Sequence, residues 1–281
     1  MVDWAQERKD SDEANIVEKY IQPCVAEFIG TTLFIATACL STLTNPMDTG
    51  VVHPALAHGL ALGALVAAFW KISGGHFNPC VSLAVFIAGG ISPILLGLYL
   101  VVQLIGGLLG ALLAKLLNGQ GAPINNNSWA ACSVGPGSSI GSALGTEIIF
   151  SSTLILVVLM VAVERHTRTG LAPMAIGFVV VAGMLGGTTI SGCCLNPVRA
   201  FGPAVVWNFW EHHWIYWVGP LISALLMALT YRLVLSGRSH RWILCGEGRN
   251  VFTSKKPPPE KKKRPPSPVR ITKDEPQKES S

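Results

Sequence analysis

Charged side chains are scarce over most of this 281-residue chain. Charged residues make up only 13% of the sequence and hydrophobic residues 50%, whereas a soluble domain devotes about a quarter of its residues to charge. Between Ile21 and Tyr231 the chain carries five basic and five acidic residues. The scarcity excludes an ordinary soluble fold and predicts an integral membrane protein in a lipid bilayer.

The net charge of +5 does not indicate a nucleic-acid partner, because the basic residues are concentrated in a tail. From Arg249 onward there are ten Lys and Arg residues against four Asp and Glu. The remainder is close to neutral. Residues 252–281 are rich in Pro and Lys and are expected to be disordered. A solvated tail is favoured over a segment that binds anionic lipid or a proline-motif partner.

The sequence also lacks the patterns of a metal centre, a cofactor site or an enzyme. The seven cysteines form no metal-type C-x-x-C pair and no paired framework. Most lie in apolar segments, so buried cysteines acting as small hydrophobic side chains are expected. We find no nucleophile–base pair and no metal cluster, and therefore expect no catalysis, cofactor or metal. The first 19 residues are polar, unlike a cleavable signal.

What the chain does contain is a series of apolar segments in a repeated order. Six of them reach the length that spans a bilayer: 24–44, 54–72, 93–117, 140–163, 171–188 and 214–235. Two shorter segments follow Asn78-Pro79 and Asn196-Pro197, where asparagine can cap a helix and proline can begin it. At ~1.5 Å per residue, about ten residues cover only half of a ~30 Å hydrocarbon core. We therefore predict two half-helices, from Pro79 to about Gly89 and from Pro197 to about Val206.

The order span, span, half-helix, span occurs twice, in repeats of about 24–117 and 140–235. Three spans in each repeat place the second copy upside down relative to the first. The predicted fold is therefore all-α, with six transmembrane helices and two re-entrant half-helices in an inverted repeat. The membrane domain is expected over 21–237, between a cytosolic segment at 1–20 and the tail at 238–281.

The distribution of Lys and Arg predicts the orientation of this domain. Lys71, Arg165, Arg168 and the tail mark one side, whereas the loops at 45–53 and 118–139 carry neither residue type. Both termini are therefore expected to be cytosolic. The protein itself is expected in the plasma membrane, with an intracellular membrane as the alternative. The loop at 118–139 is then expected on the outer side, and it holds a glycosylation acceptor pattern at Asn126.

The two half-helices are expected to meet around water. Non-helical backbone at membrane depth must line a cavity, so Asn78, Pro79, Asn196 and Pro197 are predicted to form the centre of a pore. Each half-helix N-terminus carries roughly half a positive charge. That field disfavours a cation and turns a water molecule so that its oxygen faces the asparagines, which interrupts proton hopping.

Four further polar residues within the apolar region each admit two interpretations. Glu27 and Glu147 occupy matching positions, and we favour structural support of the re-entrant loops over a proton relay. Arg199 is expected to line the outer mouth of the pore, with bracing of the loop as the alternative. His58 is either a pore-lining residue or a satisfied core histidine.

These motifs resemble those of the aquaporins, the major intrinsic protein family. The likeness runs from about Cys24 to Leu235 and is carried by 54–63, 73–79, 199–206 and 213–217. It implies a homotetramer with one pore per subunit that conducts water, with hydrogen peroxide and ammonia as further solutes.

The same resemblance implies an outer selectivity filter. It would consist of His58, Met184, Cys193 and Arg199. Cys80 and Val198 depart from the alanine that is usual after each Asn-Pro pair, which leaves the pore width open. Ala200 replaces the aspartate of glycerol-conducting relatives and argues against glycerol. Because Cys193 and Cys194 lie beside Arg199, block by mercurials is expected.

Two other classes of function compete with a passive channel. A secondary transporter also uses inverted repeats and broken helices, but it would usually carry charged residues at the midplane. A non-conducting relative used for adhesion or scaffolding would follow if Cys80 and Val198 plugged the lumen.

Overall fold

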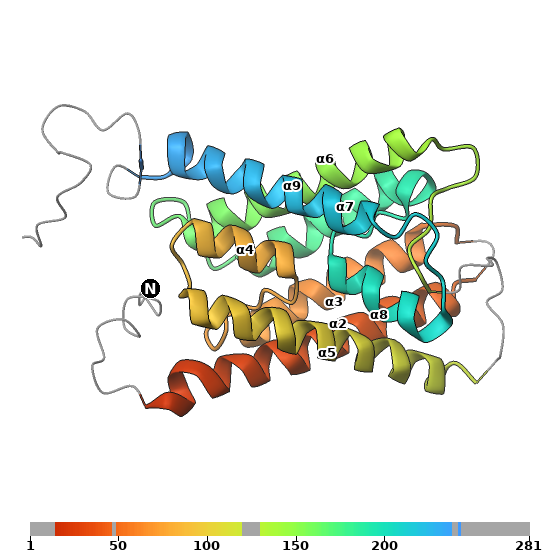
Figure 1. The fold of residues 1–281 in the computed structure, drawn as a ribbon, viewed down its shortest axis with the longest axis horizontal. Helices are drawn as coiled ribbons and strands as arrows, with labels where there is room; N and C mark the ends of the chain where they lie inside the picture. The colour runs from red at the N-terminus through yellow and green to blue at the C-terminus, as the bar shows by residue number, and fades with distance from the viewer. Residues whose placement is uncertain (1–14, 47–48, 120–129, 238–240, 243–281) are drawn as a thin grey trace, which may run out of the picture. The chain divides into compact units, whose positions relative to one another are not determined.

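The computed structural model describes residues 15–46, 49–119, 130–237 and 241–242. Within these ranges the chain is all-helical and contains no strand (Figure 1). The helical elements, in chain order, are η1 (Val17–Ile21), α2 (Gln22–Leu43), α3 (Val52–Phe69), α4 (Pro79–Ile87), α5 (Pro93–Leu117), α6 (Ile140–Val158), η2 (Leu159–Val163), α7 (Ala172–Ser191), α8 (Pro197–Trp207), α9 (Ile215–Thr230) and η3 (Tyr231–Leu235).

Six of the helices in the described ranges are long and apolar enough to cross a membrane. This confirms the predicted fold class, but three spans differ by several residues from those expected. The second span covers Val52–Phe69 rather than 54–72. The first span begins at Val17, because Pro23 lies in the first turn of α2, where proline does not interrupt a helix. The fifth continues to Ser191 and ends at Gly192, whose φ of 84° belongs to the left-handed region that glycine tolerates.

Both half-helices begin at the predicted residues. The Asn78 side chain accepts a hydrogen bond from the Cys80 N–H at 2.9 Å, and the Asn196 side chain accepts one from the Val198 N–H at 3.0 Å. Helix α4 has nine residues and α8 has eleven. Figure 1 shows the two in opposite halves of the bundle, with their N-terminal ends toward its middle.

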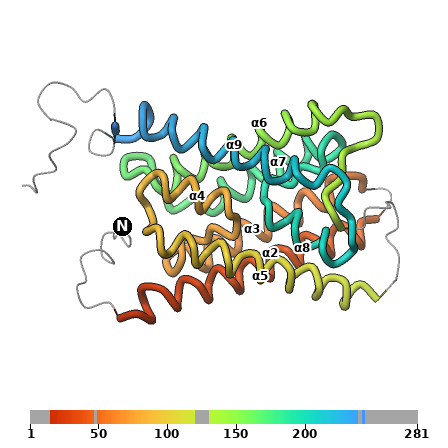
Figure 2. Tube along the Cα trace, viewed as in Figure 1, coloured from red at the N-terminus to blue at the C-terminus, as the bar shows by residue number. Residues whose placement is uncertain are grey.

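Helix pairing follows the duplication. In the first repeat α2 packs along α5, in the second α6 packs along α9, and α3 and α7 pack together across the repeats. The tube representation in Figure 2 shows the same arrangement. Gly106 and Gly110 let α5 approach the backbone of α2, because an added Cβ would meet the carbonyl oxygens of Phe28 and Thr32. This glycine pair therefore packs helices within one subunit.

Some of the predictions concern parts of the chain outside the described residues. These are the acceptor pattern at Asn126, the first 14 residues and the tail from residue 243.

Candidate functional site

A cavity of about 150 Å³ lies between the two repeats. At one end it is lined by Arg165 and Arg168, from the connection between α6 and α7; we call this end the arginine mouth. Elsewhere along its wall the cavity contacts Asn78, Asn196 and His58. Most of its wall is apolar, and the side chains that form this part are Leu62, Val66, Val81, Val85, Leu154, Val158, Ile176 and Val180. The cavity is therefore a largely apolar space with a few polar groups at defined points.

The two asparagines meet in this cavity, and each holds the loop of the other repeat. The Asn78 amide donates to the carbonyl of Leu195 at 2.9 Å, and the Asn196 amide donates to the carbonyl of Phe77 at 2.8 Å. An amide nitrogen carries two N–H groups, and its oxygen here caps the half-helix. One N–H of each asparagine is thus available to a molecule in the cavity.

Glu27 supports the first re-entrant loop. Its carboxylate accepts backbone hydrogen bonds from His76 at 2.9 Å and from Phe77 at 2.7 Å. The Ser73 hydroxyl and the Gln103 amide also donate to it, at 2.6 and 2.9 Å. Phe77 has a φ of 48°, in the left-handed region that costs a non-glycine residue about 1–3 kcal/mol. The glutamate therefore holds a backbone that would otherwise relax.

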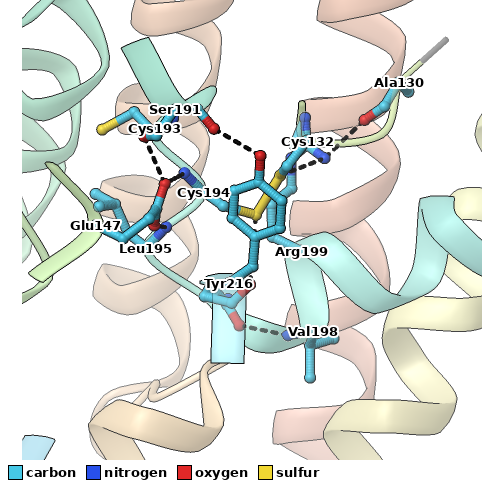
Figure 3. Close-up of a disulfide and its surroundings, with 12 residues drawn as sticks. Ala130, Cys132, Glu147, Ser191, Cys193, Cys194, Leu195, Val198, Arg199 and Tyr216 are labelled. Carbon is cyan, nitrogen blue, oxygen red and sulfur yellow. Dashed lines mark hydrogen bonds between the residues drawn. A yellow bond between two sulfur atoms is a disulfide. The ribbon is translucent and has the colours of Figure 1, made fainter. Parts of the chain in front are cut away.

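Glu147 makes the matching contacts in the second repeat, as Figure 3 shows. The N–H groups of Cys194 and Leu195 donate to its carboxylate at 2.8 and 2.9 Å, and the Ser191 hydroxyl donates at 2.8 Å. The Tyr216 hydroxyl donates to the Ser191 carbonyl at 2.8 Å. Both glutamates are fully buried, and their oxygens are occupied by loop donors.

His58 and Arg199 form the polar cluster at the other end of the cavity. His58 Nδ1 lies 2.7 Å from the carbonyl oxygen of Pro54, which can only accept, so Nδ1 carries the proton. The unprotonated Nε2 accepts from Arg199 Nε at 3.2 Å. The Arg199 guanidinium also donates to the carbonyl of Ala130 at 2.8 Å and lies 3.7 Å from Cys132 Sγ. Arg199 is thus held on two sides.

The structure brings three of the four predicted filter residues to the cavity wall. His58, Met184 and Cys193 line it. Arg199 is absent from the lining and lies against His58, with 6% of its surface exposed. The four side chains therefore gather where the cavity ends.

The two departures after the Asn-Pro pairs point away from the cavity. Cys80 and Val198 are both fully buried, and neither belongs to the lining. Val198 Cγ1 occupies the space that a side chain at Gly107 of α5 would need, since an added Cβ there would overlap it. Glycine in α5 thus accommodates the extra bulk of valine.

A disulfide joins Cys132 to Cys194, with the Cα atoms 6.1 Å apart. The expectation that the cysteines form no pair was therefore wrong for these two. Cys132 lies in the connection between α5 and α6 rather than in an apolar span, and that position was the available signal. Cys193, by contrast, is a free buried thiol. Only Cys193 of the expected mercurial pair carries a thiol in this structure.

At the arginine mouth Glu164 joins the end of the sixth span to the connection after α6. It accepts hydrogen bonds from the Tyr231 hydroxyl at 2.9 Å and from the N–H groups of His166 and Gly237 at 3.2 and 3.1 Å. Burial alone would raise the pKa of Glu164, but the donors from Gly237, His166 and Tyr231 together lower it below its ordinary value.

The described residues contain no group of three metal-ligating side chains.

The family model for the major intrinsic proteins matches residues 15–231. The chain belongs to the aquaporin family. It is 48% identical to aquaporin-8 of Mus musculus over 227 residues, which cover 81% of this chain and 87% of that protein. It is also 39% identical to aquaporin TIP1-2 of Musa acuminata, over 78% of this chain and 88% of that one.

A solved structure supports the same fold. The aquaglyceroporin from Plasmodium falciparum superposes with a TM-score of 0.68 at 21% identity, over 77% of this chain and 97% of that one. As an aquaporin, the protein is a multi-pass membrane channel for water and small neutral solutes rather than an enzyme.

Proposed function

We propose that this aquaporin is a passive pore for water, hydrogen peroxide and ammonia that excludes protons and ions. The observation that supports the proposal is the meeting of Asn78 and Asn196 in one cavity, at the N-terminal ends of two half-helices. Two partly positive helix ends disfavour a cation between them. The free N–H groups of the asparagines orient a water molecule by its oxygen, so that neighbouring water molecules point in opposite directions and a proton cannot hop through.

The proposed selectivity filter is the group of His58, Met184, Cys193 and Arg199. A solute there would find few hydrogen-bond acceptors, because the lone pair of His58 Nε2 is already used by Arg199, and its nearest charged donor would be the Arg199 guanidinium behind His58. Small solutes with an accessible oxygen or nitrogen lone pair suit that surface. The fixed charge of Arg199 repels cations.

Neither Cys80 nor Val198 argues for a closed, non-conducting relative, since both lie outside the cavity wall.

We further propose that the arginine mouth is cytosolic, because Arg165, Arg168 and Lys71 would then obey the positive-inside rule. Both termini would also be cytosolic. A homotetramer in the plasma membrane is the proposed assembly and location.

Stopped-flow measurements on purified protein in vesicles test the proposal. Water, hydrogen peroxide and ammonia should each cross faster than in empty vesicles, without saturation and with a low activation energy. Glycerol should cross much more slowly, and a pH gradient should persist. Saturable or steeply temperature-dependent flux would instead indicate a transporter, and dissipation of the pH gradient would refute proton exclusion.

Mercurial block provides a separate test of the filter. Cys193 lines the cavity as a free thiol, so a mercury ion bound there should reduce water flux at least fivefold. Cys193→Ser should abolish the block, whereas Cys24→Ser, remote from the cavity wall, should retain it. Persistent block in Cys193→Ser would place the reactive thiol elsewhere.

A further inference from the structure

The Cys132–Cys194 disulfide lies directly against the guanidinium of Arg199. Ala130, Cys132, Cys194 and Arg199 are all at least nine-tenths buried, with exposures of 0%, 7%, 6% and 6%. Figure 3 shows Arg199 beside the disulfide, with its guanidinium directed at the carbonyl of Ala130. The disulfide therefore links the segment of Ala130, whose carbonyl accepts from Arg199, to the re-entrant loop that leads into α8, the helix that carries Arg199.

The two ends of this link differ in how else they are held. Cys194 belongs to the re-entrant loop, whose backbone N–H groups at Cys194 and Leu195 are fixed by Glu147. The other end of the disulfide, Cys132, belongs to residues 130–135, which we call the outer segment. The Gly135 N–H donates to the Ile190 carbonyl at 2.9 Å and holds the C-terminal end of this segment. Between that bond and Ala130, the disulfide is the covalent anchor. Breaking it would remove the covalent tie between this segment and the re-entrant loop, while the Glu147 contacts of the loop stay in place.

We propose that the Cys132–Cys194 disulfide is the positioning element of the filter, and that its reduction widens the filter toward larger neutral solutes. With the disulfide intact, the Ala130 carbonyl holds one side of the Arg199 guanidinium while His58 Nε2 holds the other. Without it, the Ala130 carbonyl and Cys132 Sγ can both move away from Arg199, and of these three contacts the one to His58 is retained. The proposal rests on the proposed function, since it concerns the selectivity of the same pore.

The chemical step is an ordinary thiol–disulfide exchange. A thiolate of a dithiol reductant attacks one sulfur, the Cys132–Cys194 bond breaks, and a mixed disulfide forms. The second thiol of the reductant resolves it. The products are two protein thiols and one oxidised, cyclic reductant, so that two electrons and two protons pass to the protein.

The test compares glycerol and water permeability of wild-type vesicles before and after dithiothreitol, with alkylation to count the thiols. The glycerol-to-water ratio should rise at least threefold on reduction, while water permeability changes less than twofold. Cys132→Ser/Cys194→Ser should show the raised ratio without reductant and no further response. Cys24→Ser, which removes a free cysteine, should respond like the wild type.

Two results would overturn the proposal. One is an unchanged ratio in wild-type protein whose alkylation shows two additional thiols after reduction. The other is a parallel fall of water and glycerol permeability together with loss of thermal stability, which would assign the disulfide a merely structural role. The proposed function is tested separately by the oxidised protein, whose water permeability must exceed that of empty vesicles.

Discussion

The contact between Val198 and Gly107 makes a quantitative prediction about a pair of substitutions. Val198→Ala removes two buried methyl groups, at about 0.8 kcal/mol each, and leaves a small cavity, so a loss of about 2 kcal/mol is expected. Gly107→Ala would force its new methyl group into Val198 Cγ1. Overpacking of this kind costs roughly 1–3 kcal/mol, offset in part by the better helix propensity of alanine.

The double variant should be more stable than the sum of the single changes predicts. In Gly107→Ala/Val198→Ala the new methyl group fills space that the valine vacates, so its loss should be about 1 kcal/mol. The coupling between the sites is then roughly 2 kcal/mol, in the range found for residues in contact. At about 2–4 °C per kcal/mol, Val198→Ala should lower the thermal midpoint by about 4–8 °C, and the double variant by about half as much.

Thermal unfolding in detergent, followed by intrinsic fluorescence, measures these shifts, and water permeability in vesicles measures the pore. Gly145→Ala is the matched control, because an added Cβ there meets nothing within 4 Å. Water permeability of Val198→Ala should stay within twofold of wild type. Additive losses in the double variant, or a severalfold increase in water flux for Val198→Ala, would refute the packing of Val198 against α5.

Three further predictions concern polar residues. His58→Ala should raise glycerol permeability severalfold relative to water, in the vesicle assay, because it removes both bulk and the acceptor for Arg199; an unchanged ratio would exclude His58 from the filter. Glu147→Gln should cost about 3 kcal/mol or more in the thermal assay, since it removes a charged acceptor of three hydrogen bonds, whereas Glu211→Gln should be neutral. Glu164→Gln should lower stability at pH 7 by about 1 kcal/mol. Because the folded pKa of Glu164 is lowered, this difference should persist above the ordinary carboxyl pKa of about 4.3 and disappear as the pH falls through the folded value; a constant difference would contradict it.

The sequence was sufficient to predict the fold because its signals are local and repeated. Asn-Pro gives both a cap and a first turn, so α4 and α8 begin where expected. The hydrocarbon thickness limits the length of each span. The first span was misjudged because the segment from Val17 is polar and therefore fell outside the apolar window, although it continues the helix.

The site was less predictable where it depends on contacts across long separations. The sequence suggested Glu27 and Glu147 as loop supports from their matching positions, and both carboxylates accept loop N–H groups in the structure. It could not reveal the orientation of Val198, which is decided by a glycine on another helix. The Cys132–Cys194 pairing joins residues 62 apart, and no spacing rule identifies such a pair.

The crossed amide bonds also bear on how the protein is made. Asn78 reaches a carbonyl 117 residues further along the chain, and at roughly 5–20 residues per second a ribosome needs roughly 6–23 s to deliver it. During that interval the earlier loop has its glutamate support but no partner from the later repeat. A newly synthesised molecule therefore has no complete pore centre until residues of its last third have entered the bilayer.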